Sequence, residues 1–542
     1  MIRLMNPSRL LLLLLAALVP ASPAMALEKW IYAQRNLQVE KSADELIELM
    51  RRGKAAGYTH VLVSDSKFSR LATVIPQYFK NAERVKQAAQ ELGMEIVPAV
   101  CHVGYSNNML WADPNLVEAM PVKDLPLVVQ GGVARVDDPD APRLPGGDFT
   151  DLKRWSWSDP MWHLDDGAAR VTDPKGANAR IVQKLKVKPF RQYHVSVRVK
   201  TQDFKGKPEV KVLPANGTSL TWDNLRAKPT QDWATHDIVF NSQNNTDVQL
   251  YLGAWGASTG SLWFDDAKLE EIAFVNLARR GGCPLEVRTA EGKTLIEGTD
   301  FEPLKDPLMG SKPWPGEYDV FHAAPELRTN LPDGTKLTAS YYHAVTIYDG
   351  QAMVCPSEPK TMELIRDEVK RTHALFGAKG YMMSHDEVRV LNWCKACQDR
   401  NTTPGQILAE NVKACTELIR EIAPGAKIYV WNDMFDPHHN AKAKDYYLVN
   451  GTLEGSWEGL AKDVIILPWY FEKRAESLKF FADRGHRQVI AGYYDARPEQ
   501  IADWLTAARA VPGSVVGVMY TTWESKYADL EKFSEAASAA MK

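Results

Sequence analysis

Two adjacent carboxylates, Asp386 and Glu387, end an apolar run that spans residues 380–385. An apolar run of this length cut off by charge predicts a buried parallel strand that opens into a pocket. Because strand side chains alternate, both acids can face one cavity only if the strand has already turned into a loop. Two close carboxylates do not both ionise readily, so we expect one to keep its proton near neutral pH and to act as a general acid. The alternative is a plain loop acid beside a helix N-cap.

A Cys-x-x-Cys pair, Cys394 and Cys397, follows these acids, and the other four cysteines are scattered: Cys101, Cys283, Cys355 and Cys415. A zinc site needs a second such pair or spaced histidines, and the sequence shows neither. We therefore expect no metal and no cofactor. A local disulfide, or two free thiols, is expected to brace the loop behind the carboxylates.

Residues 1–26 have the pattern of a secretory signal peptide. Two arginines precede a leucine-rich core, and the segment ends in Ala24-Met25-Ala26, an Ala-x-Ala cleavage site. The apolar core is too short to span a membrane and no cysteine follows it. We expect a secreted or periplasmic protein without a membrane anchor.

The composition argues against a polyanionic partner. The net charge of the 542 residues is −3 and both signs are interspersed, so we expect no nucleic-acid partner. The sixteen tryptophans are more than a core needs, and indole faces suit sugar rings.

Strand and helix patterns alternate in two parts of the chain. Residues 27–130 hold three strands, and residues 344–542 hold five more with helices between them. Eight such repeats predict a (β/α)8 TIM barrel, whose catalytic groups lie where the strands end. Residues 434–462 have no helical stripe and are expected to form a long loop over the pocket. The expected strands are 29–35, 60–65, 95–100, 380–387, 427–433, 463–470, 488–495 and 515–521.

The ends of these strands are rich in carboxylates and aromatic residues. Such a set, without a metal-binding Cys-His group or a phosphate-binding glycine loop, favours a sugar pocket. The residues are Arg35, Asp65, His102, Asp386, Glu387, Trp431, Asp433, Trp469, Tyr470, Tyr494, Asp495, Trp523 and Glu524.

Residues 146–275 change to an alternating pattern with frequent turns, which predicts an inserted β-sandwich. The runs 193–200 and 256–269 resemble the jelly-roll carbohydrate-binding modules of polysaccharide-degrading enzymes. Trp222, Trp233 and Trp255 are the candidate sugar platforms, and a spacer without a ligand is the alternative. Residues 276–343 are expected to be a β-rich connector back to the barrel.

The segment from Cys355 through its long helix to Glu387 resembles the glycoside hydrolase family 20 β-N-acetylhexosaminidases. The resemblance implies that Glu387 protonates the glycosidic oxygen and that Asp386 polarises the 2-acetamido group of the substrate, whose carbonyl oxygen is the nucleophile. Met383-Ser384-His385 stands where the family has two glycines, which marks a divergent branch.

Further substrate-binding roles follow from the same resemblance. Arg35 would hold sugar hydroxyls, Tyr470 or Tyr494 would bind the acetamido oxygen, and Glu524 would bind a hydroxyl. The acetamido pocket would be walled by Trp431, Trp469 and Trp523. His102 and Asp433 are further candidates by position, and His385 either tunes the acid or packs in the core.

Two alternatives stay open. The first is a barrel glycosidase with a protein nucleophile such as Asp433 or Glu524, and the second is a catalytically silent glycan-binding protein. In each case the expected partner is a glycan or oligosaccharide.

Overall fold

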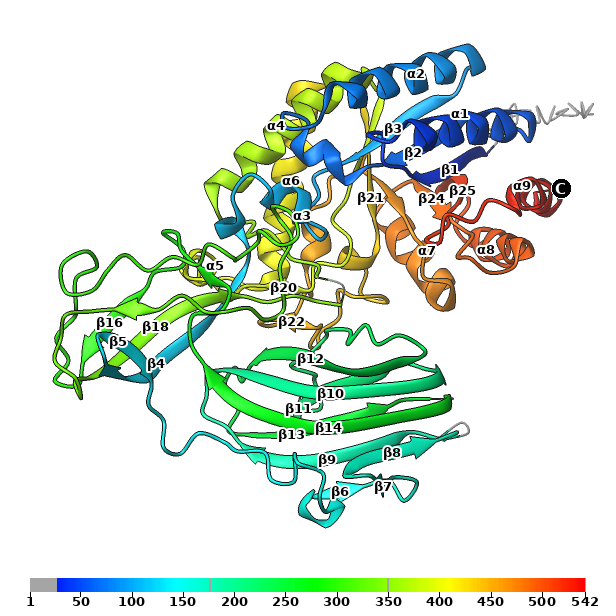
Figure 1. The fold of residues 1–542 in the computed structure, drawn as a ribbon. Coiled ribbons are helices and arrows are strands. Elements are labelled where there is room, and N and C mark those ends of the chain that lie inside the picture. Colours follow the sequence, from blue (N-terminus) through cyan, green and yellow to red (C-terminus); the bar gives the residue numbers. More distant parts are fainter. Residues whose placement is uncertain (1–26, 175–176, 257, 349, 542) are drawn as a thin grey trace, which may run out of the picture.

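The computed structural model describes residues 27–174, 177–256, 258–348 and 350–541. It consists of a barrel, a β-sandwich below it in the view of Figure 1, and a third sheet beside both. The expected signal peptide, residues 1–26, lies outside the described residues. Within the described ranges, no helix has the length and apolar character needed to cross a membrane.

Eight parallel strands form a closed barrel, which confirms the predicted number and order of strands. β3 and β19 are neighbours, with Met382 beside Ala99, although the whole insertion separates them in sequence. β25 closes the ring onto β1. In barrel order the strands are β1 (Glu28–Gln34), β2 (His60–Ser64), β3 (Glu95–Val100), β19 (Gly380–Met383), β21 (Lys427–Trp431), β23 (Ile465–Leu467), β24 (Gln488–Ala491) and β25 (Val515–Tyr520).

Helices cover the outside of the barrel (Figure 1). They are α1 (Glu40–Ala55), α2 (Pro76–Leu92), α4 (Pro359–Phe376), α6 (Pro404–Ile422), α7 (Arg474–Asp483), α8 (Ile501–Ala508) and α9 (Leu530–Ala540). Local sequence sets their ends: Thr403 and Gln406 form a capping box at α6, and Gly377 ends α4 in the left-handed conformation. The predicted loop 434–462 contains only short elements.

Short elements connect these parts. They are α3 (Asn107–Leu110), α5 (Lys395–Gln398), β20 (Val390–Leu391), β22 (Leu448–Val449) and the 3-10 turns η1 (Ser66–Arg70), η2 (Pro114–Leu116), η3 (Leu152–Arg154), η4 (Asp433–Phe435), η5 (Ser456–Gly459), η6 (Phe471–Lys473) and η7 (Pro498–Gln500). β20 and β22 pair with each other in parallel, between the barrel and the sandwich in the view of Figure 1.

Alternation along the barrel strands separates two apolar layers. On β1, Trp30 and Tyr32 point into the barrel, where they pack with residues such as Met382. Ile31 and Ala33 point outward into the layer shared with the helices. Because both faces of each strand are buried, the strands have the continuous apolar sequences from which they were predicted.

The insertion is a two-sheet sandwich, as predicted. One sheet has the order β12 (Gln231–Asn241), β10 (Gln192–Lys205), β14 (Thr259–Ile272), β8 (Ala168–Thr172) and β7 (His163–Asp165). The other has the order β11 (Pro208–Pro214), β13 (Asp247–Ala254), β9 (Ala179–Lys186) and β6 (Trp157–Ser158). Trp222, a predicted platform, lies against Tyr447, with ring centroids 4.2 Å apart, and so packs between sandwich and barrel.

The third sheet corrects one predicted boundary. β4 (Ala119–Gln130) was expected to belong with the barrel, but it pairs antiparallel with β18 (Lys336–Ala344) of the connector. Long-range pairing of this kind leaves no local sequence signal. The other strands of this sheet are β5 (Val133–Val136), β15 (Leu277–Ala278), β16 (Glu286–Thr289) and β17 (Leu327–Arg328).

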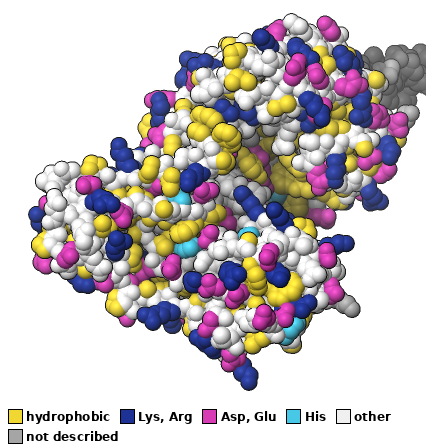
Figure 2. All heavy atoms as spheres, in the orientation of Figure 1, with side chains coloured by type: hydrophobic (Ala, Val, Ile, Leu, Met, Phe, Trp, Pro, Cys, Tyr) yellow, Lys and Arg dark blue, Asp and Glu magenta, His cyan; other side chains and the backbone are white. Residues whose placement is uncertain are grey.

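All six cysteines are among the described residues, and each is buried and free of disulfides. Of the two expected states of Cys394 and Cys397, the structure therefore has the free thiols. Lys and Arg side chains alternate with Asp and Glu over the face shown in Figure 2, as the interspersed sequence indicates.

Candidate active site at the mouth of the barrel

A cavity of about 640 Å³ opens at the carboxyl ends of the barrel strands. This is the face on which barrel enzymes place their catalytic groups. Each of the eight strands, or the loop that follows it, contributes to the lining. The structure brings nine of the predicted residues together here: Arg35, Asp65, His102, Asp386, Glu387, Trp431, Trp469, Tyr494 and Trp523.

The two carboxylates share this cavity because β19 ends at Met383, before them. Glu387 has a positive φ of 52°, so the chain turns sharply between the acids. The backbone of Gly104 lies against this turn. A Cβ at Gly104 would be only 1.7 Å from the carbonyl oxygen of Asp386, so a residue with a side chain does not fit without a backbone shift. The predicted strand-to-loop transition is confirmed.

Polar contacts surround Glu387. Its backbone N–H donates to Asp433 Oδ2 at 3.1 Å. Its carboxylate accepts a hydrogen bond from the Tyr105 hydroxyl and forms an ion pair with Arg389, whose Nη2 is 2.5 Å from Oε2. Arg389 is 7% exposed, and its other contacts, to Gln351 and the rings of nearby tyrosines, fix it behind Glu387.

Asp386 has a different environment. The Ser384 hydroxyl donates to its Oδ1 at 2.9 Å. Burial, and next the negative charge of Glu387, raise the pKa of Asp386, while the Ser384 hydrogen bond and the charge of His102 act in the opposite direction. The raised pKa of Asp386 agrees with the expectation that one acid of such a pair is harder to ionise.

His102 is held by a buried carboxylate. Its Nδ1 lies 2.5 Å from Oε1 of Glu368 on α4, and Ser69 donates to the same oxygen. Burial alone would lower the pKa of His102, but the charge and hydrogen bond of Glu368 outweigh it, so that the pKa is raised. His102 Nε2 has no hydrogen-bond partner among the described residues, which leaves it available to a ligand in the cavity.

Aromatic rings form one wall of the cavity. Trp469 and Tyr494 are stacked, with centroids 5.6 Å apart and planes 5° from parallel. Trp523 contacts Trp431 at 5.6 Å and Tyr32 at 5.3 Å. Flat rings with N–H groups at their edges bind a face of a sugar while leaving donors for its polar substituents.

Four predicted site residues are not among the residues that line this cavity. His385 is buried behind the strand, where Nε2 meets Asn411 Oδ1 at 2.9 Å. Asp433 is buried and accepts from the backbone of Glu387, so it braces the turn. Tyr470 stacks on His439, and Glu524 is exposed and pairs with Lys526.

The sequence did not single out several residues that contact the site. Tyr105 and Arg389 reach Glu387 from loops, and Tyr32 supplies part of the wall from inside β1. Asp495, predicted only as a strand end, accepts from the backbone N–H of Trp523 at 2.7 Å and so positions that ring. For Arg389 there was one usable signal, since a cation two residues after an acid can pair with it.

Comparison with known proteins identifies one family in part of the chain. Residues 153–269 match the carbohydrate-binding-module family described as BppA domain 1. This segment is the inserted sandwich. No curated protein sequence matches the chain.

The chain is also similar to solved structures at low sequence identity. A structure titled "CBM4 structure and function" is 20% identical, covering 28% of this chain and 97% of its own, with a TM-score of 0.18. A rhamnosidase from Novosphingobium sp. PP1Y is 11% identical over 96% of this chain, with a TM-score of 0.34, and the match spans 60% of its length. The family 20 catalytic modules of the pneumococcal exo-β-D-N-acetylglucosaminidase StrH are 9% identical over 95% of this chain and 84% of theirs, with a TM-score of 0.35. The family match shows that the inserted sandwich is similar to carbohydrate-binding modules.

Proposed function

We propose that this protein is an exported glycoside hydrolase that cleaves a β-linked N-acetylhexosamine, using a barrel of the (β/α)8 class. The observation that carries the proposal is the shared cavity: Asp386 and Glu387 lie in one chamber with Trp431, Trp469 and Trp523. The match of the sandwich to carbohydrate-binding modules supports a carbohydrate substrate.

The proposed reaction is substrate-assisted. Glu387 donates a proton to the glycosidic oxygen, while the carbonyl oxygen of the 2-acetamido group attacks the anomeric carbon and the leaving group departs. Asp386 accepts a hydrogen bond from the acetamido N–H and stabilises the charge that develops on the amide. Water then attacks the anomeric carbon and gives a proton to Glu387, which restores the acid and returns the acetamido group.

Two conditions must be met before this reaction can start. Glu387 must leave its ion pair with Arg389 and take up the proton that it donates, and Asp386, whose pKa is raised by burial, must be ionised. An acetamido N–H donated to Asp386 favours its ionised form. Substrate binding would therefore help to meet the second condition.

A second candidate follows from the same two observations. The ion pair with Arg389 favours an ionised Glu387, which could act as the nucleophile. The raised pKa of Asp386 favours a role as the proton donor. With these roles the enzyme would use a protein nucleophile and would not need an acetamido group. Asp433 and Glu524, the nucleophiles expected from the sequence, do not line the cavity.

Aryl β-glycosides with and without the 2-acetamido group distinguish the two candidates. The proposed reaction predicts hydrolysis of the N-acetyl substrates and little hydrolysis of the others. Glu387→Gln should lower kcat/KM by about 10²–10⁴-fold, the usual contribution of a general acid. Glu472→Gln, an exposed acid on η6, is the matched control and should retain wild-type activity.

An oxazoline-mimicking thiazoline provides the second measurement. Tight competitive inhibition is expected only of an acetamido-assisted enzyme, and hydrolysis of both substrate classes without thiazoline inhibition would favour the protein nucleophile. Glycan binding without hydrolysis of any glycoside would instead favour a binding protein. Unchanged hydrolysis in Glu387→Gln would refute the assignment of the acid in the first candidate.

We also propose that the protein is exported. The support is the signal-like pattern of residues 1–26. Amino-terminal sequencing of the protein from its native host should find a mature chain that starts at Leu27, and an intact amino terminus would refute export by cleavage.

A further inference from the structure

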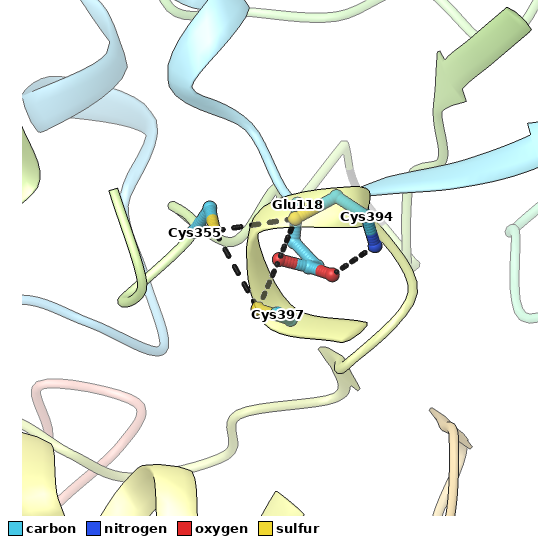
Figure 3. A group of neighbouring side chains, drawn as sticks. All are labelled: Glu118, Cys355, Cys394 and Cys397. Carbon is cyan, nitrogen blue, oxygen red and sulfur yellow. Dashed lines mark hydrogen bonds between the residues drawn. The ribbon is translucent and has the colours of Figure 1, made fainter. Parts of the chain in front are cut away.

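Four buried side chains from three distant parts of the chain meet behind the active-site loop. They are Glu118, Cys355, Cys394 and Cys397, whose ligand atoms all lie within 4.8 Å of one another (Figure 3). Glu118 immediately precedes β4, Cys355 lies ahead of α4, and Cys394 and Cys397 flank the start of α5. The three thiols and the carboxylate point toward a common centre in Figure 3.

Four of the six distances between ligand atoms in this cluster are close to those of a tetrahedral zinc site. Cys355 Sγ is 3.4 Å from Cys394 Sγ and 3.6 Å from Cys397 Sγ. Zn–S bonds of about 2.3 Å in a tetrahedron place sulfur atoms about 3.8 Å apart, whereas a disulfide would place them about 2.0 Å apart. Glu118 Oε2 is 3.5 Å from the sulfurs of Cys394 and Cys397. A Zn–O bond of about 2.0 Å gives about 3.5 Å for this edge.

Glu118 is oriented as a ligand would be. It is 1% exposed, and its Oε1 accepts the backbone N–H groups of Trp393 at 2.7 Å and Cys394 at 2.9 Å. These bonds fix the carboxylate and leave Oε2 directed at the thiols. A second set of contacts that orients a ligand in this way is typical of metal sites. A buried carboxylate next to three buried thiols has no comparable explanation in packing alone.

A cation lies beside the cluster. Arg280 contacts the sulfur of Cys283 and pairs with Glu358 at 2.8 Å, and the Cys283 thiol interacts electrostatically with Cys394. Three thiolates and one carboxylate exceed the charge of a divalent ion. The guanidinium of Arg280 offsets part of this excess, and Cys283 links it to the cluster.

We propose that Glu118, Cys355, Cys394 and Cys397 bind a structural zinc ion. Soft thiolates in a tetrahedral arrangement select zinc among common divalent ions, and four protein ligands leave no position for substrate. The site is separate from the barrel cavity, whose lining contains none of the four residues. It therefore stands or falls independently of the proposed hydrolysis.

The ion would fasten the loop that carries the carboxylates. Cys394 follows Glu387 by a few residues, and β20 lies between them. Zinc would join this loop to Glu118, where the chain leaves the barrel for the third sheet, and to Cys355, where it returns. Thiols this close in an exported protein would otherwise be open to oxidation, and coordination protects them.

Metal analysis of the full-length protein, purified without chelators from zinc-replete cells, tests the proposal. We expect one zinc ion per chain in the wild type and background zinc in Cys394→Ser and Cys397→Ser. Cys415→Ser is the matched control, because Cys415 is buried in α6 outside the cluster, and it should keep its zinc. Background zinc in the wild type, a different metal in stoichiometric amount, or a disulfide among these cysteines would overturn the proposal.

Cobalt substitution keeps the test valid if a variant does not fold. The wild-type protein reconstituted with Co²⁺ should show the visible bands of tetrahedral coordination and thiolate charge-transfer absorption corresponding to three thiolates. Glu118→Gln should weaken zinc binding by at least about 10–100-fold, whereas Cys283→Ser should preserve the cobalt spectrum. A spectrum corresponding to four thiolates, or one changed by Cys283→Ser alone, would overturn the assignment of Glu118 as the fourth ligand.

Discussion

We expect His343, a buried residue that joins the inserted sandwich to the third sheet, to make the stability of the protein depend on pH. His343, on β18, is fully buried, and its Nδ1 lies 3.1 Å from both Ala344 O and Gln192 Nε2. Its Nε2 lies 3.0 Å from Asn241 Nδ2 on β12. Asn241 Nδ2 also donates to Pro121 O at 2.9 Å. We infer that Nδ1–H donates to the carbonyl and that Nε2 accepts. A proton on Nε2 would then face an N–H donor.

This arrangement explains the direction and size of the expected effect. Burial lowers the pKa of His343 from 6.5 to about 4, so the folded state keeps the ring neutral where the unfolded state takes up a proton. The contribution to stability is fully present above pH 6.5 and is lost as pH falls toward 4. At about 1.36 kcal/mol per pH unit, the interval corresponds to about 3 kcal/mol.

Urea unfolding between about pH 4.5 and pH 7.5 measures this contribution. The wild type should lose stability as pH falls through this range, and His343→Gln should lose less by up to about 3 kcal/mol, because glutamine does not titrate. His163→Gln, at an exposed histidine on β7, is the matched control and should follow the wild type. Equal pH slopes for the wild type and His343→Gln would refute the reasoning.

Three further predictions concern the barrel mouth. Gly104→Ala should lower kcat by about 100-fold, because the new Cβ would displace the Asp386 backbone. Gly281→Ala is the control, since a Cβ there meets no atom within 4 Å, and equal kcat values for the two variants would contradict the close approach of Gly104 to Asp386. In Glu387→Gln, the acidic limb of the pH profile of the residual kcat/KM should move to lower pH, because the variant lacks the negative charge that helps to raise the pKa of Asp386. An acidic limb at the wild-type pH would show that Asp386 does not govern this limb. Trp431→Ala should destabilise the protein by about 3–5 kcal/mol and weaken glycan binding, since this ring is 1% exposed and faces the cavity. Thermal unfolding measures the stability and calorimetric titration measures the affinity, and an unchanged glycan affinity would show that Trp431 does not bind the glycan.

The strands of the barrel could be predicted because each carries its own signal. A parallel strand buried on both faces is apolar throughout and ends at a polar residue, as β21 does at Asn432. Parallel strands in a closed ring bring their carboxyl ends to one rim. The strand ends therefore predicted Trp431, Trp469 and Trp523 as neighbours before any contact was known.

Residues that reach the site from loops could not be predicted in the same way. Tyr105 contacts Glu387 across a separation of 282 residues, and nothing in either local sequence indicates this. Asp433 and Glu524, in contrast, were predicted to belong to the site but do not line the cavity. Both follow barrel strands, but the chain has already turned, so that Asp433 faces the backbone of Glu387 and Glu524 faces solvent.

The cysteines show why spacing rules fail for a split domain. Sequence patterns for metal sites require two pairs of ligands that are each close in sequence. Here only Cys394 and Cys397 form such a pair, and the other two residues of the cluster come from distant parts of the chain. Glu118 is 276 residues from Cys394. The insertion separates these segments in sequence, and the closure of the barrel returns them to one place.

The insertion interrupts the barrel next to the loop that carries the two carboxylates, and the proposed zinc ion would hold this loop in place. β3 and β19 pair through Met382 with Ala99 and Met383 with Val100, and the backbone of Ser384 bonds to Val100 and Val103 just beyond. The carboxylates begin two residues later, at Asp386. Beyond that point the position of Glu387 depends on contacts at the rim. A metal tie between the exit of the insertion, its return and the end of this loop would hold Glu387 in place without occupying the cavity. Loss of the metal should therefore disturb the active-site loop before the barrel itself unfolds, because the strand ladder does not include the four ligands.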